Sequence, residues 1–326
     1  MTRAGFLTAA TLCMATASTA QPPAATNTVT TAIPGVVAAG TSVEVIKAGF
    51  TGTEGPIGLP DGSLIFTETQ ANRITRIDKD TGATSVFLEN TNGSNGLGFD
   101  AKGRLISVQT TPGQARIGVI HPKDAVRTIT DSFDGKPYGR PNDLVVAKNG
   151  GIYFSEPGPN AVPGQPPAAP PLPPAVYYVS PAGTVSRVAE GIERPNGVML
   201  SADEKTLYVN NTAGDSLLAF DVKADGTLGP RRTFAKYGKV TTTPAGAVTS
   251  GADGLAIDAA GRVYAATAAG VEVFSPRGET LGAIPVSLAP QNIAFAGTDK
   301  KTLYIVGRGA AFKVRLLTEG YQGRAK

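Results

Sequence analysis

The chain has 326 residues, of which 41% are hydrophobic and 17% charged, so it is long enough to bury a substantial core. This composition argues against a disordered chain and against an integral membrane protein. The 30 Lys and Arg residues exceed the 26 Asp and Glu residues by only four, and they are scattered along the chain. This charge pattern argues against nucleic acid as a partner, and no membrane partner is expected.

The counts of single residue types exclude several kinds of site. The chain contains one Cys and one His, which excludes a Cys/His zinc site, a disulfide framework and a cysteine protease. A Ser-His-Asp triad would have to use His121, which we expect in a surface turn before Pro122. The 40 Gly and 25 Pro residues favour many short strands joined by turns.

The N-terminal segment is typical of a secretory signal. Arg3 supplies a positive charge, residues 5–17 are apolar but too short to span a bilayer, and residues 18–20 offer a small-x-small cleavage pattern. We therefore predict a signal peptide over residues 1–20 and a periplasmic or secreted protein; the alternative is an N-terminal segment of a cytosolic protein. Residues 21–41 are rich in Ala, Thr and Pro, which predicts a flexible linker.

A short apolar strand core recurs six times along the rest of the chain. The cores begin at Leu64, Leu105, Ile152, Leu207, Val263 and Leu303. Their spacings of 41, 47, 55, 56 and 40 residues, each with a turn before the core, are typical of β-propeller blades. We predict an all-β, six-bladed β-propeller over residues 42–318 and a C-terminal tail over 319–326. Residues 43–46 should close the ring by pairing with 312–315.

Two insertions interrupt the repeat. Residues 157–174 contain nine prolines, so they cannot form a central strand and are expected to leave the third unit as an extended surface segment. This segment is either part of a lid or a polyproline-like spacer. Residues 241–249 form a second candidate insertion.

A polar residue stands ten or eleven positions before each strand core. These residues are Glu54, Asn95, Asn142, Asn196, Asp253 and Asn292. Because each precedes the innermost strand of its blade, the six should converge at one end of the central channel as a ring of oxygen atoms. Such a ring suits a hard divalent cation, with Ca²⁺ as the first choice. The alternative is that the Asn-Gly and Asp-Gly pairs are ordinary hairpin turns, which fits Glu54 and Asn142 poorly.

Four ordered motifs resemble those of a known family. They are Glu54-Gly55-Pro56, Arg140-Pro141-Asn142-Asp143, Arg194-Pro195-Asn196-Gly197 and Asp253-Gly254-Leu255. The chain from about residue 44 to 317 resembles the gluconolactonase, regucalcin (senescence marker protein) and luciferin-regenerating enzyme family of six-bladed propellers. The resemblance implies a central divalent-metal site at Glu54, Asn196 and Asp253, and substrate contacts at Arg140 and Asn142. The metal would be Ca²⁺, with Mg²⁺, Mn²⁺ or Zn²⁺ as alternatives.

The chain departs from the family near the expected substrate. Gln109 stands where many members have a Glu-His pair, and Ser155 and Glu156 replace a usual Thr-Asp. Asn95 and Gln109 are therefore added to the candidate substrate-binding residues, and the preferred substrate of this chain is left open.

The resemblance implies a lactonase that hydrolyses a small-molecule sugar lactone to the aldonic acid. A cation in the channel would polarise the carbonyl group, and Asp253 is the candidate general base because a carboxylate, unlike an amide, accepts a proton from water. Two alternatives are an aryl-ester or phosphotriester hydrolase that uses the same site, and a non-catalytic secreted propeller that binds a ligand.

Overall fold

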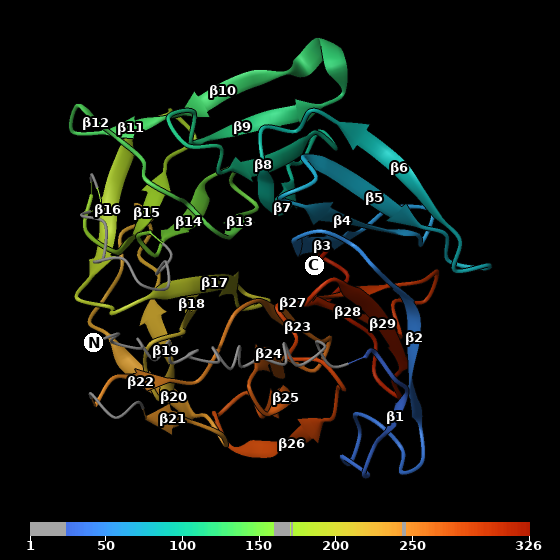
Figure 1. Cartoon of the computed structure of the whole chain (residues 1–326). Helices are drawn as coiled ribbons and strands as arrows, with labels where there is room; N and C mark the ends of the chain where they lie inside the picture. The colour runs from blue at the N-terminus through green and yellow to red at the C-terminus, as the bar shows by residue number, and fades with distance from the viewer. Residues whose placement is uncertain (1–23, 160–169, 171, 243–245) are drawn as a thin grey trace, which may run out of the picture.

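The computed structural model describes residues 24–159, 170, 172–242 and 246–326. These residues form six antiparallel sheets, five of four strands and one of five, arranged as blades around a central axis (Figure 1). The predicted all-β, six-bladed propeller is therefore confirmed. Each repeated strand core lies in the second strand of a blade, where it is packed on both faces by neighbouring blades.

In the first five blades the strands follow one another from the axis outward. Blade 1 contains β3 (Thr53–Gly58), β4 (Leu64–Glu68), β5 (Arg73–Ile77) and β6 (Thr84–Glu89). Blade 2 contains β7 (Ser94–Phe99), β8 (Leu105–Gln109), β9 (Arg116–His121) and β10 (Arg127–Thr130). Blade 3 contains β13 (Leu144–Val146), β14 (Ile152–Glu156), β15 (Ala175–Val179) and β16 (Val185–Glu190). Blade 4 contains β17 (Pro195–Leu200), β18 (Thr206–Asn211), β19 (Ser216–Asp221) and β20 (Arg232–Lys236). Blade 5 contains β23 (Leu255–Ile257), β24 (Val263–Thr267), β25 (Gly270–Phe274) and β26 (Thr280–Ile284).

The sixth blade closes the ring by combining strands from both ends of the propeller. It contains β27 (Asn292–Ala296), β28 (Thr302–Gly307), β29 (Ala310–Arg315) and β2 (Ser42–Ala48), with β1 (Thr28–Val29) outside β2. Val43 pairs with Val314 and Val45 with Phe312, so the predicted closure is confirmed. This pairing covers the edge that β29 would otherwise expose.

The segment before the first blade differs from the sequence-based expectation. Residues 24–41 were expected to be a flexible linker, but β1 pairs with β2 and the side chains of Ile33, Val36 and Val37 are at most 1% exposed. These three residues join the apolar cluster between blades 5 and 6. The linker prediction is wrong for residues 24–41, because a few aliphatic side chains among Ala, Thr and Pro suffice to dock the segment. The expected signal segment, residues 1–20, lies outside the described residues.

The insertions lie between strands, as expected. Residues 157–174 connect β14 to β15, although 160–169 and 171 lie outside the described residues. The second insertion contains the short hairpin strands β21 (Thr241–Thr242) and β22 (Val248–Thr249), and a similar hairpin of β11 (Ser132–Phe133) and β12 (Lys136–Pro137) joins blades 2 and 3.

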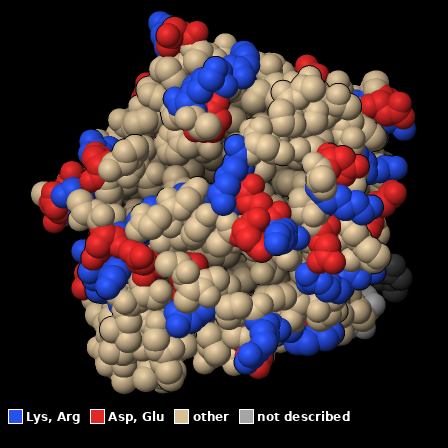
Figure 2. Space-filling model, turned by 180° about the vertical axis from the view of Figure 1, so that it is seen from behind, with Lys and Arg blue, Asp and Glu red and all other residues tan. Residues whose placement is uncertain are grey.

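The helical content of the described ranges is a single 3-10 turn, η1 (Lys123–Ala125). None of the helical structure in these ranges is long and apolar enough to cross a membrane. On the face shown in Figure 2, acidic and basic side chains are interspersed rather than gathered into one large patch of a single charge.

Residues 319–326 cross the face of the propeller where the innermost strands end, and we call this segment the strap. It begins with a bridge between Gly320 and Asp258 of blade 5. Arg324 Nη1 donates to the carbonyl oxygen of Leu200 in blade 4 at 2.8 Å, and the backbone N–H of Gly58 in blade 1 donates to Ala325 at 2.8 Å. The predicted C-terminal tail is thus bound to several blades.

A buried carboxylate organises the first blade and gives a testable stability prediction. Glu68 is fully buried and accepts hydrogen bonds from Arg73 Nε at 2.7 Å, Thr75 Oγ1 at 2.6 Å and the backbone N–H of Thr51 at 3.0 Å. Burial by itself would raise the pKa of Glu68, but these hydrogen bonds outweigh it and leave the pKa below its ordinary value.

We expect Glu68→Gln to lower the free energy of unfolding by about 2 kcal/mol at neutral pH, because a charge-assisted network loses its charge. Since the folded-state pKa is depressed, the wild type holds this stabilisation above the unfolded-state pKa, about 4.3, and loses it as the pH falls through the folded-state value. Urea unfolding at neutral pH and at decreasing acidic pH should show the difference between the two proteins shrinking. A difference that stays constant with pH would contradict this account.

Candidate active site

The six innermost strands form a closed ring around the axis. Each contacts the next, in the order β3, β7, β13, β17, β23, β27 and back to β3. The predicted polar residues lie at the beginning of these strands or one or two positions before them. Glu54, Asn95, Asn142, Asn196 and Asn292 are at most 6% exposed. Asp253 is partly exposed, but its Oδ1 atom is buried.

The glycines that follow the polar residues permit this close approach of neighbouring blades. A Cβ atom added at Gly55 would lie 2.0 Å from the carbonyl oxygen of Asn95, and one added at Gly197 would lie 2.1 Å from that of Asp253. The backbone N–H of Gly197 donates to the same Asp253 oxygen at 3.0 Å. These positions lie in the innermost strands, so the hairpin-turn alternative is wrong: the glycines are needed where backbones converge on the axis.

Unpartnered buried polar atoms are concentrated among the predicted site residues. Ten buried side-chain nitrogen and oxygen atoms of the described residues have no hydrogen-bond partner, and six of these ten belong to the predicted site. The six atoms are Asn95 Oδ1, Asn95 Nδ2, Arg140 Nη1, Asn142 Oδ1, Asn196 Oδ1 and Asp253 Oδ1. Because an unpartnered buried polar group is costly, such a cluster is typical of a site that is completed by a ligand.

The acidic residues of the ring repel one another. Burial raises the pKa of Glu54, and burial followed by the charges of Glu54 and Asp143 raises the pKa of Asp253 well above its ordinary value. The carboxylate of Glu54 accepts only long hydrogen bonds, 3.3 Å from Gln291 Nε2 and 3.3 Å from Asn292 Nδ2. A positive charge placed among these oxygens would relieve the repulsion.

The donor set fits a hard divalent cation. Asn196 Oδ1 and Asp253 Oδ1 are buried acceptors without partners, and Glu54 adds a second carboxylate. Asn196 Nδ2 donates to Thr212 Oγ1 at 3.1 Å, which fixes the amide and leaves its oxygen available. Within the described ranges no group of three His, Cys, Asp or Glu residues is placed to hold a metal ion, so a cation here would need amide oxygens as well as carboxylates. The metal roles of these residues remain predictions.

The candidate substrate residues divide into two groups. Asn95, Asn142 and Arg140 each have an unpartnered atom in the ring region. Gln109 is instead engaged within blade 2, where its Oε1 accepts hydrogen bonds from Asn92 Nδ2 at 3.0 Å and Arg116 Nε at 2.8 Å. This engagement gives Gln109 a structural role, and its predicted contact with substrate stays untested.

Glu156 positions the loop that carries Arg140. It lies fully buried at the end of β14, and its Oε1 and Oε2 accept the backbone N–H of Arg140 at 2.9 and 3.2 Å. Burial raises the pKa of Glu156. In the sequence this residue stands out only as a departure from the family pattern, and in the structure the length of its side chain lets it reach the loop.

Lys326 and Asp143 form a buried ion pair below the ring that no sequence pattern indicated. Lys326 Nζ donates to Asp143 Oδ1 at 2.8 Å and to Asp143 Oδ2 at 2.6 Å, and both side chains are at most 5% exposed. The two residues are 183 positions apart, so no local pattern indicated their contact.

Comparison with known proteins gives consistent matches. The family described as the SMP-30/Gluconolactonase/LRE-like region matches residues 52–308. A gluconolactonase from Zymomonas mobilis is 28% identical over 307 residues, covering 86% of this chain and 83% of that protein. A pentonolactonase from Haloferax volcanii is 24% identical over 262 residues, covering 78% of this chain and 81% of that protein.

Solved structures show the same architecture. A gluconolactonase from Xanthomonas campestris superposes with a TM-score of 0.74 at 28% identity, covering 91% of this chain and 96% of that chain. The calcium-binding protein regucalcin from Agrobacterium tumefaciens superposes with a TM-score of 0.67 at 17% identity, covering 86% of this chain and 95% of that chain. At this lower identity the likeness concerns the fold alone.

Proposed function

This chain belongs to the SMP-30/Gluconolactonase/LRE-like family, and from that premise we propose that it is a lactonase that opens a sugar lactone to the aldonic acid. Relatives that align over most of the chain are named gluconolactonase and pentonolactonase. The observation that carries the proposal is the group of six unpartnered polar atoms at the mouth of the channel. Buried donors and acceptors without partners support the proposal of a small polar ligand and a cation at this place.

Glu54, Asn196 and Asp253 would hold one divalent cation, with Ca²⁺ favoured over Mg²⁺, Mn²⁺ or Zn²⁺ because all the donors are oxygens. When bound, the cation supplies an electrophile for the lactone carbonyl and a charge that stabilises the oxyanion.

Asp253 acts as the general base in this mechanism. Its carboxylate accepts a proton from the water as that water attacks the lactone carbonyl carbon. The ring C–O bond then breaks, and Asp253 returns the proton to the departing ring oxygen, which gives the hydroxy acid and restores the carboxylate. In the cation-free protein burial and the charges of Glu54 and Asp143 raise the pKa of Asp253, and a bound cation would lower it, which favours the ionised carboxylate that accepts the proton.

Arg140, Asn142 and Asn95 orient the sugar. Their unpartnered atoms include the donors Arg140 Nη1 and Asn95 Nδ2 and the acceptor Asn142 Oδ1, a combination that matches hydroxyl groups. Glu156 holds the Arg140 backbone in place. Such positioning contributes to the rate without touching the bond that breaks.

The test is whether the purified protein hydrolyses aldonolactones. The acid that is released is measured by pH-stat titration, and the rate of spontaneous lactone hydrolysis is subtracted. We expect chelation with EDTA to lower the enzymatic rate at least about 100-fold and Ca²⁺ to restore it, because binding and charge stabilisation both depend on the ion. An aryl ester and a phosphotriester assayed on the same preparation separate a lactonase from a hydrolase of other bonds. A protein that opens no aldonolactone with Ca²⁺, Mn²⁺ or Zn²⁺ supplied would remove the proposal.

We also propose that the protein is periplasmic or secreted, on the basis of the signal-like residues 1–20. Mass spectrometry of the protein isolated from its host should show that these residues have been removed. A mature chain that retains them would contradict this localisation.

A further inference from the structure

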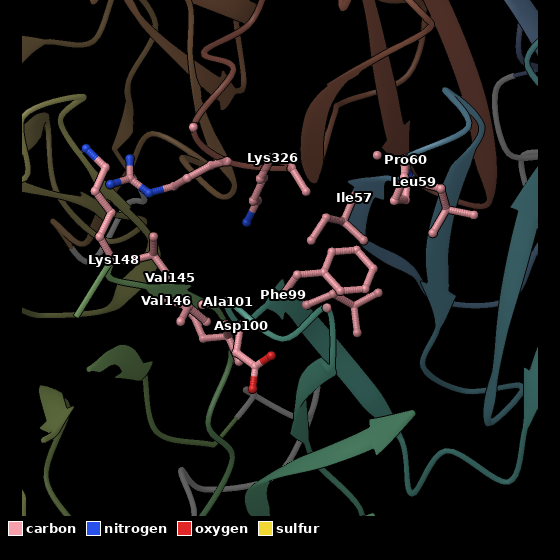
Figure 3. A pocket seen from close by; sticks show the side chains of 18 of the residues that line it. Ile57, Leu59, Pro60, Phe99, Asp100, Ala101, Val145, Val146, Lys148 and Lys326 are labelled. Atoms are coloured by element: carbon pink, nitrogen blue, oxygen red, sulfur yellow. The ribbon is translucent and has the colours of Figure 1, made fainter. Parts of the chain in front are cut away.

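The strap brings a buried positive charge to the end of the channel opposite the candidate metal site. Residues of the strap line a pocket of about 720 Å³ together with apolar residues that include Ile57 and Leu144. In Figure 3 the side chain of Lys326 projects into this pocket, with Ile57 on one side and Val145 on the other. Its side chain is only 5% exposed, so Lys326 is an internal residue of the channel.

The partner of Lys326 is directly connected to the candidate site. Asp143 follows Asn142, whose carbonyl oxygen accepts the backbone N–H of Gly96 at 3.0 Å. A Cβ atom added at Gly96 would lie 2.6 Å from Asp143 Oδ1, so the Asp143 carboxylate packs against the innermost strand that carries Asn95. Asp143 is therefore a third acidic residue within the ring of strands, beside Glu54 and Asp253.

The charges of this pair reach the candidate metal ligands. Burial is the main cause of the raised pKa of Glu54; the charge of Asp143 adds to it, whereas the hydrogen bond from Asn292 and the charges of Arg140 and Lys326 oppose it. The charge of Asp143 also contributes to the raised pKa of Asp253, after burial and the charge of Glu54. Since Glu54, Asp143 and Lys326 are buried, a change in the charge of one of them is felt by the others.

We propose that Lys326 is a positioning residue of the metal centre: it neutralises Asp143 from the opposite end of the channel, so that Asp143 adds no net negative charge beside the Glu54 and Asp253 carboxylates that would bind the cation. The inference rests on the proposed metal centre. The ammonium group occupies both oxygens of Asp143, which keeps this carboxylate from turning toward the ring. Glu54 and Asp253 are then the carboxylates that face the cation, and the charge of Arg140 acts on both of them.

Matched variants can separate this electrostatic role from a structural one. Lys326→Arg keeps a paired charge, whereas Lys326→Arg with Asp143→Asn leaves a guanidinium that stays protonated without its partner. Lys326→Met with Asp143→Asn replaces the pair by neutral groups. Calcium affinity is measured for each protein by isothermal titration calorimetry near neutral pH, and folding is checked separately by circular dichroism and thermal unfolding.

We expect the Lys326→Arg/Asp143→Asn protein to bind Ca²⁺ about tenfold or more weakly than Lys326→Arg, because an unpaired positive charge repels the cation across the channel. The Lys326→Met/Asp143→Asn protein should bind Ca²⁺ with nearly the wild-type affinity, whatever its thermal stability. If the arginine double variant fails to fold, the single variant Asp143→Asn, which leaves Lys326 without its partner, takes its place.

The outcomes distinguish the inference from the function on which it rests. If the wild type binds Ca²⁺ but all folded variants bind it within twofold of one another, Lys326 is merely structural and the inference is wrong. If the wild type binds no divalent cation at all, the proposed metal centre is wrong and the inference falls with it. A neutral double variant that binds as weakly as the arginine double variant would also overturn it, because charge would then not be the cause.

Discussion

Asp253→Asn is expected to abolish lactone hydrolysis while making the cation-free protein more resistant to heat. The amide cannot accept the proton of the attacking water and is a weaker cation ligand, so kcat/KM should fall about 1000-fold or more. The carboxylate it replaces is held near Glu54 and Asp143 with a pKa well above its ordinary value, so its charged form destabilises the fold at neutral pH. Removing that charge should raise the Tm measured in EDTA.

A matched control uses the same substitution at another buried aspartate. Asp258 accepts hydrogen bonds from Arg262 Nη1 at 2.9 Å and Tyr264 Oη at 3.0 Å, outside the ring of polar residues. We expect Asp258→Asn to lower the Tm and leave turnover of the folded protein intact. If Asp253→Asn retained full turnover, Asp253 would not be the base, and the non-catalytic ligand-binding alternative would gain support.

Gly197→Ala is expected to damage both the fold and the site. Its Cβ would lie 2.1 Å from the backbone carbonyl oxygen of Asp253, and backbone cannot move aside as a flexible side chain can. Blades 4 and 5 would have to separate, which breaks the 3.0 Å hydrogen bond from Gly197 to Asp253. We expect a loss of about 3 kcal/mol in the free energy of unfolding, measured by urea denaturation, and weaker Ca²⁺ binding by the remaining folded protein.

Gly229→Ala provides the comparison for this prediction. The nearest atom to its Cβ would be Asp221 Cβ at 3.5 Å, an ordinary van der Waals contact, so the change in stability should stay within about 0.5 kcal/mol. Equal effects at Gly197 and Gly229 would show that the close approach of blades 4 and 5 is not what requires a glycine.

The ring of polar residues illustrates how far sequence spacing leads in a repeat protein. Glu54 and Asn292 are 238 positions apart, yet each stands at the same register before a strand core, and the structure joins them by a hydrogen bond. The spacing predicted this convergence because each blade repeats one local pattern of turn and strand. The chemical identity of the ligand does not follow from the spacing, because the register of the strands places the oxygen atoms and carries no information on which ion or molecule they bind.

The role of the glycines beside these residues could not be predicted from the local sequence. Asn95-Gly96 and Asp253-Gly254 have the composition of hairpin turns, and only the closed ring shows that the glycines admit a neighbouring backbone or side chain. Gln109 also has a role that its position in the sequence did not indicate, because its oxygen accepts hydrogen bonds from Asn92 and Arg116, while its contact with substrate stays a prediction.

By itself the sequence determined the number of blades, the pairing of 43–46 with 312–315 and the register of the polar ring, because these depend on periodic turns and strand cores that each unit encodes locally. The docking of residues 24–41 and the ion pair of Lys326 with Asp143 were decided only by the tertiary structure. Both contacts join segments without a repeat pattern to surfaces that exist only after the ring has closed, so no local periodicity could indicate them.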